Sequence, residues 1–168
     1  RASNLSKESQ IIAANIDQAF IMLTVKMPET PVEFIDRFLA TAEAYRIPAA
    51  LIINKSDLYG AEEKAFAEKL QSVYGSIGYE TWIVSVEKNE NLEPVRAALT
   101  GRTTLVAGNS GVGKSSFLNR LNPSLKLKTA IISEYHEQGK HMTTFPEMHP
   151  LPGGGFVIDT PGIRGFGV

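Results

Sequence analysis

The chain has 168 residues, with 17 Lys and Arg against 18 Asp and Glu, a formal charge of −1, and no Cys. This length suits one domain with a core of its own. The lack of cysteine excludes disulfides, thiolate nucleophiles and cysteine-ligated zinc or iron–sulfur sites in these residues. The near-neutral charge gives no broad electrostatic footprint for nucleic acid, which usually requires a basic excess.

No segment has the pattern of a targeting or membrane sequence. The N-terminal residues lack an apolar signal-peptide core, and the longest apolar runs, at 19–23 and 49–53, are too short to span a bilayer. We therefore expect a cytoplasmic, monomeric protein with no membrane partner. Both ends look cut, so we expect residues 1–168 to be one domain of a longer protein.

Ile- and Val-rich runs alternate with helical-period segments, which predicts a three-layer α/β/α fold with a mostly parallel sheet. Strands are expected at 19–25, 49–54, 80–85, 103–107 and 155–159. Helices are expected at 31–45, 61–74 and 92–99 and from about residue 113. Thr30 is a candidate N-cap, and the second helix should end before Gly75. Residues 152–155 (PGGG) predict a hairpin tip between 145–149 and 156–158. We expect the side chains of His136 and His149 to face solvent.

The strand at 49–54 leads into N-K-S-D at 54–57, at the carboxyl end of a strand where open α/β folds bind ligands. The Asp57 carboxylate can accept hydrogen bonds from guanine N1–H and the 2-amino group, neither of which adenine offers. Asn54 would brace the loop and reach the base, while the Lys55 stem would cover the purine. Ser85 and Val86 follow the next strand and could present a backbone N–H to guanine O6. Alone, N-K-x-D is more often a polar turn.

Residues 108–115 (GNSGVGKS) fit the phosphate-binding pattern G-x-x-x-x-G-K-[ST], between a predicted strand and a predicted helix. Such a loop surrounds phosphate with backbone N–H groups, and the helix N-terminus adds a favourable dipole. Lys114 should bridge the β- and γ-phosphates, and the Ser115 hydroxyl should bind Mg²⁺. The alternative is a glycine-rich turn without a ligand. The candidate nucleotide-binding residues here are Gly108, Asn109, Ser110, Gly111, Val112, Gly113, Lys114, Ser115 and Ser116.

Two later segments should converge on the same site. Residues 125–144 form a long polar connection, in which Thr143 or Thr144 could bind Mg²⁺ and contact the γ-phosphate; entry into a strand is the alternative. D-T-P-G at 159–162 offers the Asp159 carboxylate, which would contact Mg²⁺ through water, and the Gly162 N–H for the γ-phosphate.

These motifs occur in a rotated order, because the base-recognition motif precedes the phosphate-binding loop instead of following it. With SGVGKSS at 110–116, GKHMTT at 139–144 and DTPGIRGFG at 159–167, the chain resembles the RsgA (YjeQ) family of circularly permuted GTPases. The resemblance implies GTP hydrolysis during late maturation of the small (30S) ribosomal subunit, stimulated by that subunit, with the subunit and its rRNA as partners. It also implies flanking OB-fold and zinc-binding domains outside these residues, with zinc confined to the latter and with most ribosome contacts made through both.

Hydrolysis of GTP requires a group that orients the attacking water. Ile163 stands where many GTPases carry a glutamine that orients the attacking water, so we expect slow intrinsic hydrolysis. His141 is a candidate replacement, and a surface histidine is the alternative. Competing functions are a nucleotide-gated ribosome-binding module with negligible hydrolysis, another permuted ribosome-assembly GTPase, and a P-loop ATPase or small-molecule kinase.

Overall fold

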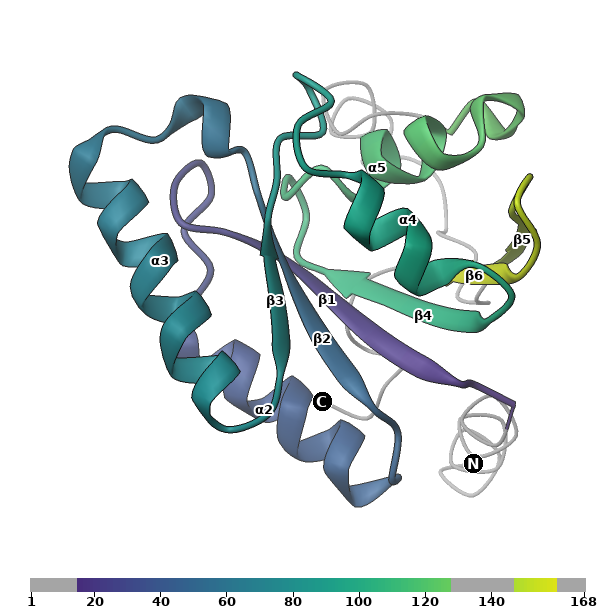
Figure 1. Cartoon of the computed structure of the whole chain (residues 1–168), viewed down its shortest axis with the longest axis horizontal. Coiled ribbons are helices and arrows are strands. Elements are labelled where there is room, and N and C mark those ends of the chain that lie inside the picture. Colours follow the sequence, from purple (N-terminus) through teal and green to yellow (C-terminus); the bar gives the residue numbers. More distant parts are fainter. Residues whose placement is uncertain (1–14, 128–146, 160–168) are drawn as a thin grey trace, which may run out of the picture.

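The computed structural model of the chain describes residues 15–127 and 147–159 (Figure 1). A six-stranded sheet runs through it in the order β3-β2-β1-β4-β6-β5. The strands are β1 (Gln18–Thr24), β2 (Ala49–Asn54), β3 (Glu80–Ile83), β4 (Thr103–Gly108), β5 (Glu147–Pro150) and β6 (Phe156–Asp159). The helices are α2 (Val32–Ala44), α3 (Ala61–Ser76), α4 (Glu93–Leu99) and α5 (Lys114–Leu121), with short 3₁₀ turns η1 (Ser56–Leu58) and η2 (Pro123–Leu125).

The predicted mostly parallel sheet is confirmed. Strands β1, β2, β3, β4 and β6 pair in parallel, and β5 alone among the described strands pairs antiparallel, with β6. The β5–β6 hairpin turns at the predicted glycine-rich tip. Among the described residues, no helix is both long and apolar enough to cross a membrane.

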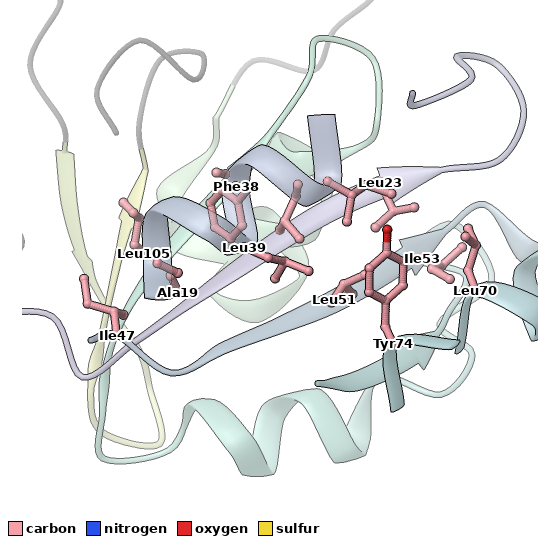
Figure 2. Packing of buried hydrophobic residues seen from close by; sticks show 14 of the residues in the cluster. Ala19, Leu23, Phe38, Leu39, Ile47, Leu51, Ile53, Leu70, Tyr74 and Leu105 are labelled. Carbon is pink, nitrogen blue, oxygen red and sulfur yellow. The ribbon is translucent and has the colours of Figure 1, made fainter. Parts of the chain in front are cut away.

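Two apolar cores lie on opposite faces of the sheet, because alternate side chains of the central strands point to opposite sides. One core packs α2 and α3 against residues such as Leu23, Leu51 and Ile53 (Figure 2). The other packs α4 and α5 against residues such as Met22 and Ile52. Figure 1 shows the two helix pairs on opposite sides of the strands. Burial on both faces explains why these strands read as continuous apolar runs.

Three local predictions are wrong. Helix α2 begins at Val32 with Pro31 as its N-cap residue, because the Thr30 hydroxyl accepts a hydrogen bond from Thr24 N at 3.2 Å instead of capping the helix. Helix α3 continues through Gly75 to Ser76, and the chain takes a left-handed turn at Gly78 (φ +99°). His149 is 9% exposed, because its position on β5 turns the imidazole inward.

The sheet register brings the predicted motifs to one edge. Asn54, the last residue of β2, pairs with Thr24 of β1, while Gly108 at the end of β4 pairs with Met22. Asp159, at the end of β6, pairs with Val106 of β4. All these strands are parallel, so their carboxyl ends form a single edge where segments distant in sequence meet.

Candidate functional site

The phosphate-binding loop follows β4 directly and ends where α5 begins, at Lys114. Gly108 closely approaches β1, since a Cβ there would lie 2.8 Å from the Met22 carbonyl oxygen. Gly113 has φ +96°, and a Cβ there would lie 2.5 Å from Asn54 Nδ2. Two glycines of the motif are therefore required by the fold of the loop. Ser115 and Ser116 occupy the first turn of α5 and are half-buried.

Asn54 ties the base-recognition motif to the phosphate-binding loop. Its amide is buried, with 3% of the residue exposed, and Nδ2 donates to the Val112 carbonyl at 2.9 Å. Its Oδ1 accepts a hydrogen bond from Val86 N at 3.0 Å. One side chain thus joins the ends of β2 and β4 and the loop after β3. The Val86 N–H, predicted to be available to a base, is engaged by Asn54 in this structure.

Asp57 lies in η1 and is exposed, and its Oδ1 accepts a hydrogen bond from the buried Ser85 hydroxyl at 2.7 Å. Ser85 Oγ also accepts a hydrogen bond from Lys88 N at 3.1 Å. The loop is closed by a two-way backbone bridge between Ser85 and Glu90. Ser85 therefore holds one carboxylate oxygen of Asp57 in a fixed position from a rigid loop.

Lys55 leaves the strand in a left-handed conformation (φ 69°), and its Nζ donates to the Met27 carbonyl at 2.6 Å. This contact links the connection between β2 and α3, which carries Lys55, to the connection between β1 and α2, which carries Met27. Partial burial lowers the pKa of the Lys55 ammonium below its ordinary value, and the nearby Asp57 carboxylate opposes that shift.

Lys114 Nζ and Asp159 Oδ1 form an ion pair at 2.9 Å, and both side chains are largely buried. The pair connects the first residue of α5 to the last residue of β6. The predicted phosphate-binding lysine and the carboxylate predicted to lie near Mg²⁺ are thus brought together by strand order.

A family model described as RsgA GTPase matches residues 1–168. The chain belongs to the RsgA GTPase family. It is 52% identical over 167 residues to a small ribosomal subunit biogenesis GTPase RsgA of Bacteroides fragilis, covering 99% of this chain and 54% of that protein. A protein of the same name from Phocaeicola vulgatus is 53% identical, with the same coverage. The chain thus spans about half the length of these curated relatives.

Two solved structures have the same fold. The crystal structure of YjeQ from Thermotoga maritima matches with a TM-score of 0.76 and 36% identity, covering 92% of this chain and 50% of that one. YloQ, titled a circularly permuted GTPase, matches with a TM-score of 0.65 and 31% identity, covering 88% of this chain and 45% of that one. The predicted family and the permuted GTPase topology are confirmed.

Several predicted site residues of this RsgA-family chain lie outside the described residues. They are His141, Thr143, Thr144 and Gly162, together with Ile163. The predicted residues that the structure describes meet at the carboxyl edge of the sheet.

Tyr59 belongs to the site and was missed by the sequence analysis. Its phenol donates to the Asn54 carbonyl and accepts a hydrogen bond from Val25 N at 2.9 Å. Burial raises the pKa of the Tyr59 phenol, so it stays a neutral donor. An aromatic residue two positions after Asp57 carries no motif signal, which is why spacing could not reveal it.

Proposed function

We propose that this chain binds GTP and GDP and hydrolyses GTP, as the nucleotide switch of a protein acting in late maturation of the small (30S) ribosomal subunit. The observation that carries the proposal is Asn54, which joins a base-recognition motif to a phosphate-binding loop. The names of the relatives support the ribosomal role. Because the chain spans about half of those proteins, the contacts with the subunit and its rRNA, through flanking OB-fold and zinc-binding domains, are part of the proposal.

Guanine selectivity would come from Asp57. Its carboxylate can accept two parallel hydrogen bonds, from N1–H and the 2-amino group, whereas adenine offers neither donor. Sites built on such bonds reject the analogue that lacks them by roughly 10⁴-fold. The Ser85 hydroxyl, 2.7 Å from Oδ1, supports this role because it orients the carboxylate before a base arrives. Lys55, held by the Met27 carbonyl, would cover the purine face.

The phosphates would lie against residues 108–116, with backbone N–H groups around them and Lys114 neutralising their charge. The donors present fit Mg²⁺, which prefers one or two protein oxygens together with substrate phosphates. No group of three or more His, Cys, Asp or Glu side chains suited to hold a metal occurs among the described residues, so substrate oxygens would be needed as well. Ser115, Asp159 and one of Thr143 and Thr144 would hold the ion, which when bound would neutralise phosphate charge.

In hydrolysis, a water oxygen bonds to the γ-phosphorus, the bond to the β–γ bridging oxygen breaks with its electron pair leaving on GDP, and the water proton passes to phosphate. Lys114 and the Gly162 N–H would stabilise the charge that develops on these oxygens. Ile163 cannot hydrogen-bond a water, so turnover of the isolated protein would be slow. In the complex with the small subunit, His141 would orient the water.

Nucleotide titration of the full-length protein tests the binding proposal. We expect GDP to bind at least about 10³-fold more tightly than ADP. Equal affinities would favour an ATPase or kinase and contradict guanine recognition. Arg37→Ala, a change at an exposed position on α2, should keep the wild-type affinities for both GDP and ADP.

Ile163 also favours a second candidate, a nucleotide-gated ribosome-binding module that hydrolyses almost no GTP. Phosphate release with and without purified small subunits separates the two candidates. Stimulation by the subunits supports the switch enzyme, and His141→Ala should remove most of that stimulation. Absence of hydrolysis in both conditions, with GTP binding intact, supports the module.

A further inference from the structure

Arg120 connects the helix of the phosphate-binding loop to the loop that carries Ser85. It lies in the last turn of α5, and its Nη2 donates to the Val86 carbonyl at 3.0 Å and to the Glu87 carbonyl at 3.3 Å. No motif of the family resemblance includes this residue, and the sequence analysis did not select it.

Both backbone polar groups of Val86 are hydrogen-bonded. Asn54 Oδ1 accepts from its N–H in the buried interior, while Arg120 donates to its carbonyl from the outer surface. Arg120 is itself anchored, because its own carbonyl accepts a hydrogen bond from Arg96 Nη2 of α4 at 3.1 Å. The loop after β3 is therefore attached to Asn54 of β2 on its inner side and to Arg120 of α5 on its outer side.

We propose that Arg120 is a positioning residue for guanine recognition, which acts by holding the Val86 and Glu87 carbonyls so that Ser85 keeps its hydrogen bond to Asp57. The proposal rests on the proposed function, since it assigns a role in selecting the guanine base. The Glu87 carbonyl and the Lys88 N–H belong to one peptide group, and that N–H donates to Ser85 Oγ, so a shift of the backbone that Arg120 holds would disturb the Ser85 hydroxyl. Asp57 is exposed and would then lose the partner that fixes its Oδ1.

The test is a double-mutant cycle on GDP binding in the full-length protein. Arg120→Ala should weaken GDP binding about fivefold, as expected for losing charge-assisted bonds at a partly exposed site. Ser85→Ala should also weaken it. The double variant should be no weaker than the worse single variant by more than about twofold, because both changes act on the same carboxylate.

Two further readouts separate positioning from general stability. IDP lacks the 2-amino group, so Arg120→Ala should reduce the ratio of GDP to IDP affinity, whereas loss of fold would weaken both equally. Arg120→Lys keeps a cationic donor and should recover part of the GDP affinity. Arg37→Ala, an exposed arginine change on α2, is the control and should change neither value.

Additive effects in the cycle, or an unchanged GDP-to-IDP ratio in Arg120→Ala, would overturn the positioning role while leaving the proposed function intact. If the wild-type protein itself fails to prefer GDP over ADP, the proposed function fails and this role fails with it. A reduced ratio, non-additivity and partial recovery by lysine together would support it.

Discussion

Lys114 Nζ lies 2.9 Å from Asp159 Oδ1, so the lysine of the phosphate-binding loop is paired with the carboxylate that ends β6. Nucleotide phosphates would compete with Asp159 for this ammonium. The carboxylate would therefore have two opposed effects on nucleotide affinity, since it occupies Lys114 and also offers an oxygen near Mg²⁺.

Asp159→Asn should separate these two effects. Without Mg²⁺, the variant should bind GDP at least as tightly as the wild type, because the Asp159 carboxylate no longer attracts the Lys114 ammonium. With Mg²⁺, it should bind about tenfold more weakly, because a carboxylate near the ion is lost. Titration calorimetry in EDTA and in Mg²⁺ measures both. An equal loss in both conditions would mean that the ion pair does not compete with phosphate.

Lys114→Ala should weaken GDP binding by about 10- to 100-fold, since it removes a charge-assisted contact to phosphate. Lys64→Ala is the matched control, because Lys64 is an exposed lysine on α3, outside the phosphate-binding loop. Wild-type affinity in Lys114→Ala would show that phosphate is not bound at this loop.

Gly113→Ala should abolish nucleotide binding. The new Cβ would lie 2.5 Å from Asn54 Nδ2 in a backbone with φ +96°, so Asn54 must move away from the Val112 carbonyl. Gly78→Ala is the control, because it has φ +99° but nothing within 4 Å of the added carbon. Gly78→Ala should cost about 1 kcal/mol of stability and leave GDP binding unchanged. Similar binding losses in both variants would argue against the Asn54 contact.

Tyr59→Phe tests the phenol that donates a hydrogen bond to the Asn54 carbonyl. Removal of the hydroxyl leaves the Val25 N–H and the Asn54 carbonyl without this partner, which should cost about 1–2 kcal/mol in stability at neutral pH. The variant should also bind GDP more weakly, because Asn54 loses a contact that positions it. Denaturant unfolding and GDP titration measure the two effects, and an unchanged stability would contradict the role given to this phenol.

The same variant has a predicted pH dependence. Burial raises the pKa of Tyr59 above its ordinary value near 10, so folding favours the neutral phenol. Its contribution is therefore complete below about pH 10 and is lost as pH rises through the raised pKa. Unfolding free energies measured from pH 8 to 12 should fall less steeply in Tyr59→Phe than in the wild type. Equal slopes would contradict the assignment.

Periodicity predicted the fold because β1, β2 and β4 are buried on both faces and read as continuous apolar runs. Motif spacing also identified the residues that the carboxyl edge brings together, since Asn54, Gly108 and Asp159 each end a strand. The helix ends were less predictable. Glycine commonly ends a helix, but α3 continues past Gly75. The left-handed turn that leads to β3 comes at Gly78.

The contacts that hold the site together could not be derived from spacing. Tyr59 and Arg120 act through backbone carbonyls, and such acceptors exist at every residue, so no sequence pattern marks the pairing. His149 shows the same limitation, because its polar type suggested exposure, whereas the residue is buried on β5.

Guanine recognition by Asp57 is the central claim, and the specificity of Asp57→Asn tests it most directly. An asparagine at this position can accept from N1–H and donate to a 2-oxo group, so the variant should prefer xanthosine diphosphate. Competitive titration of wild type and variant against GDP and xanthosine diphosphate is the measurement. We expect a reversal of preference by at least about 100-fold; retention of full GDP preference in Asp57→Asn would show that Asp57 does not select the base.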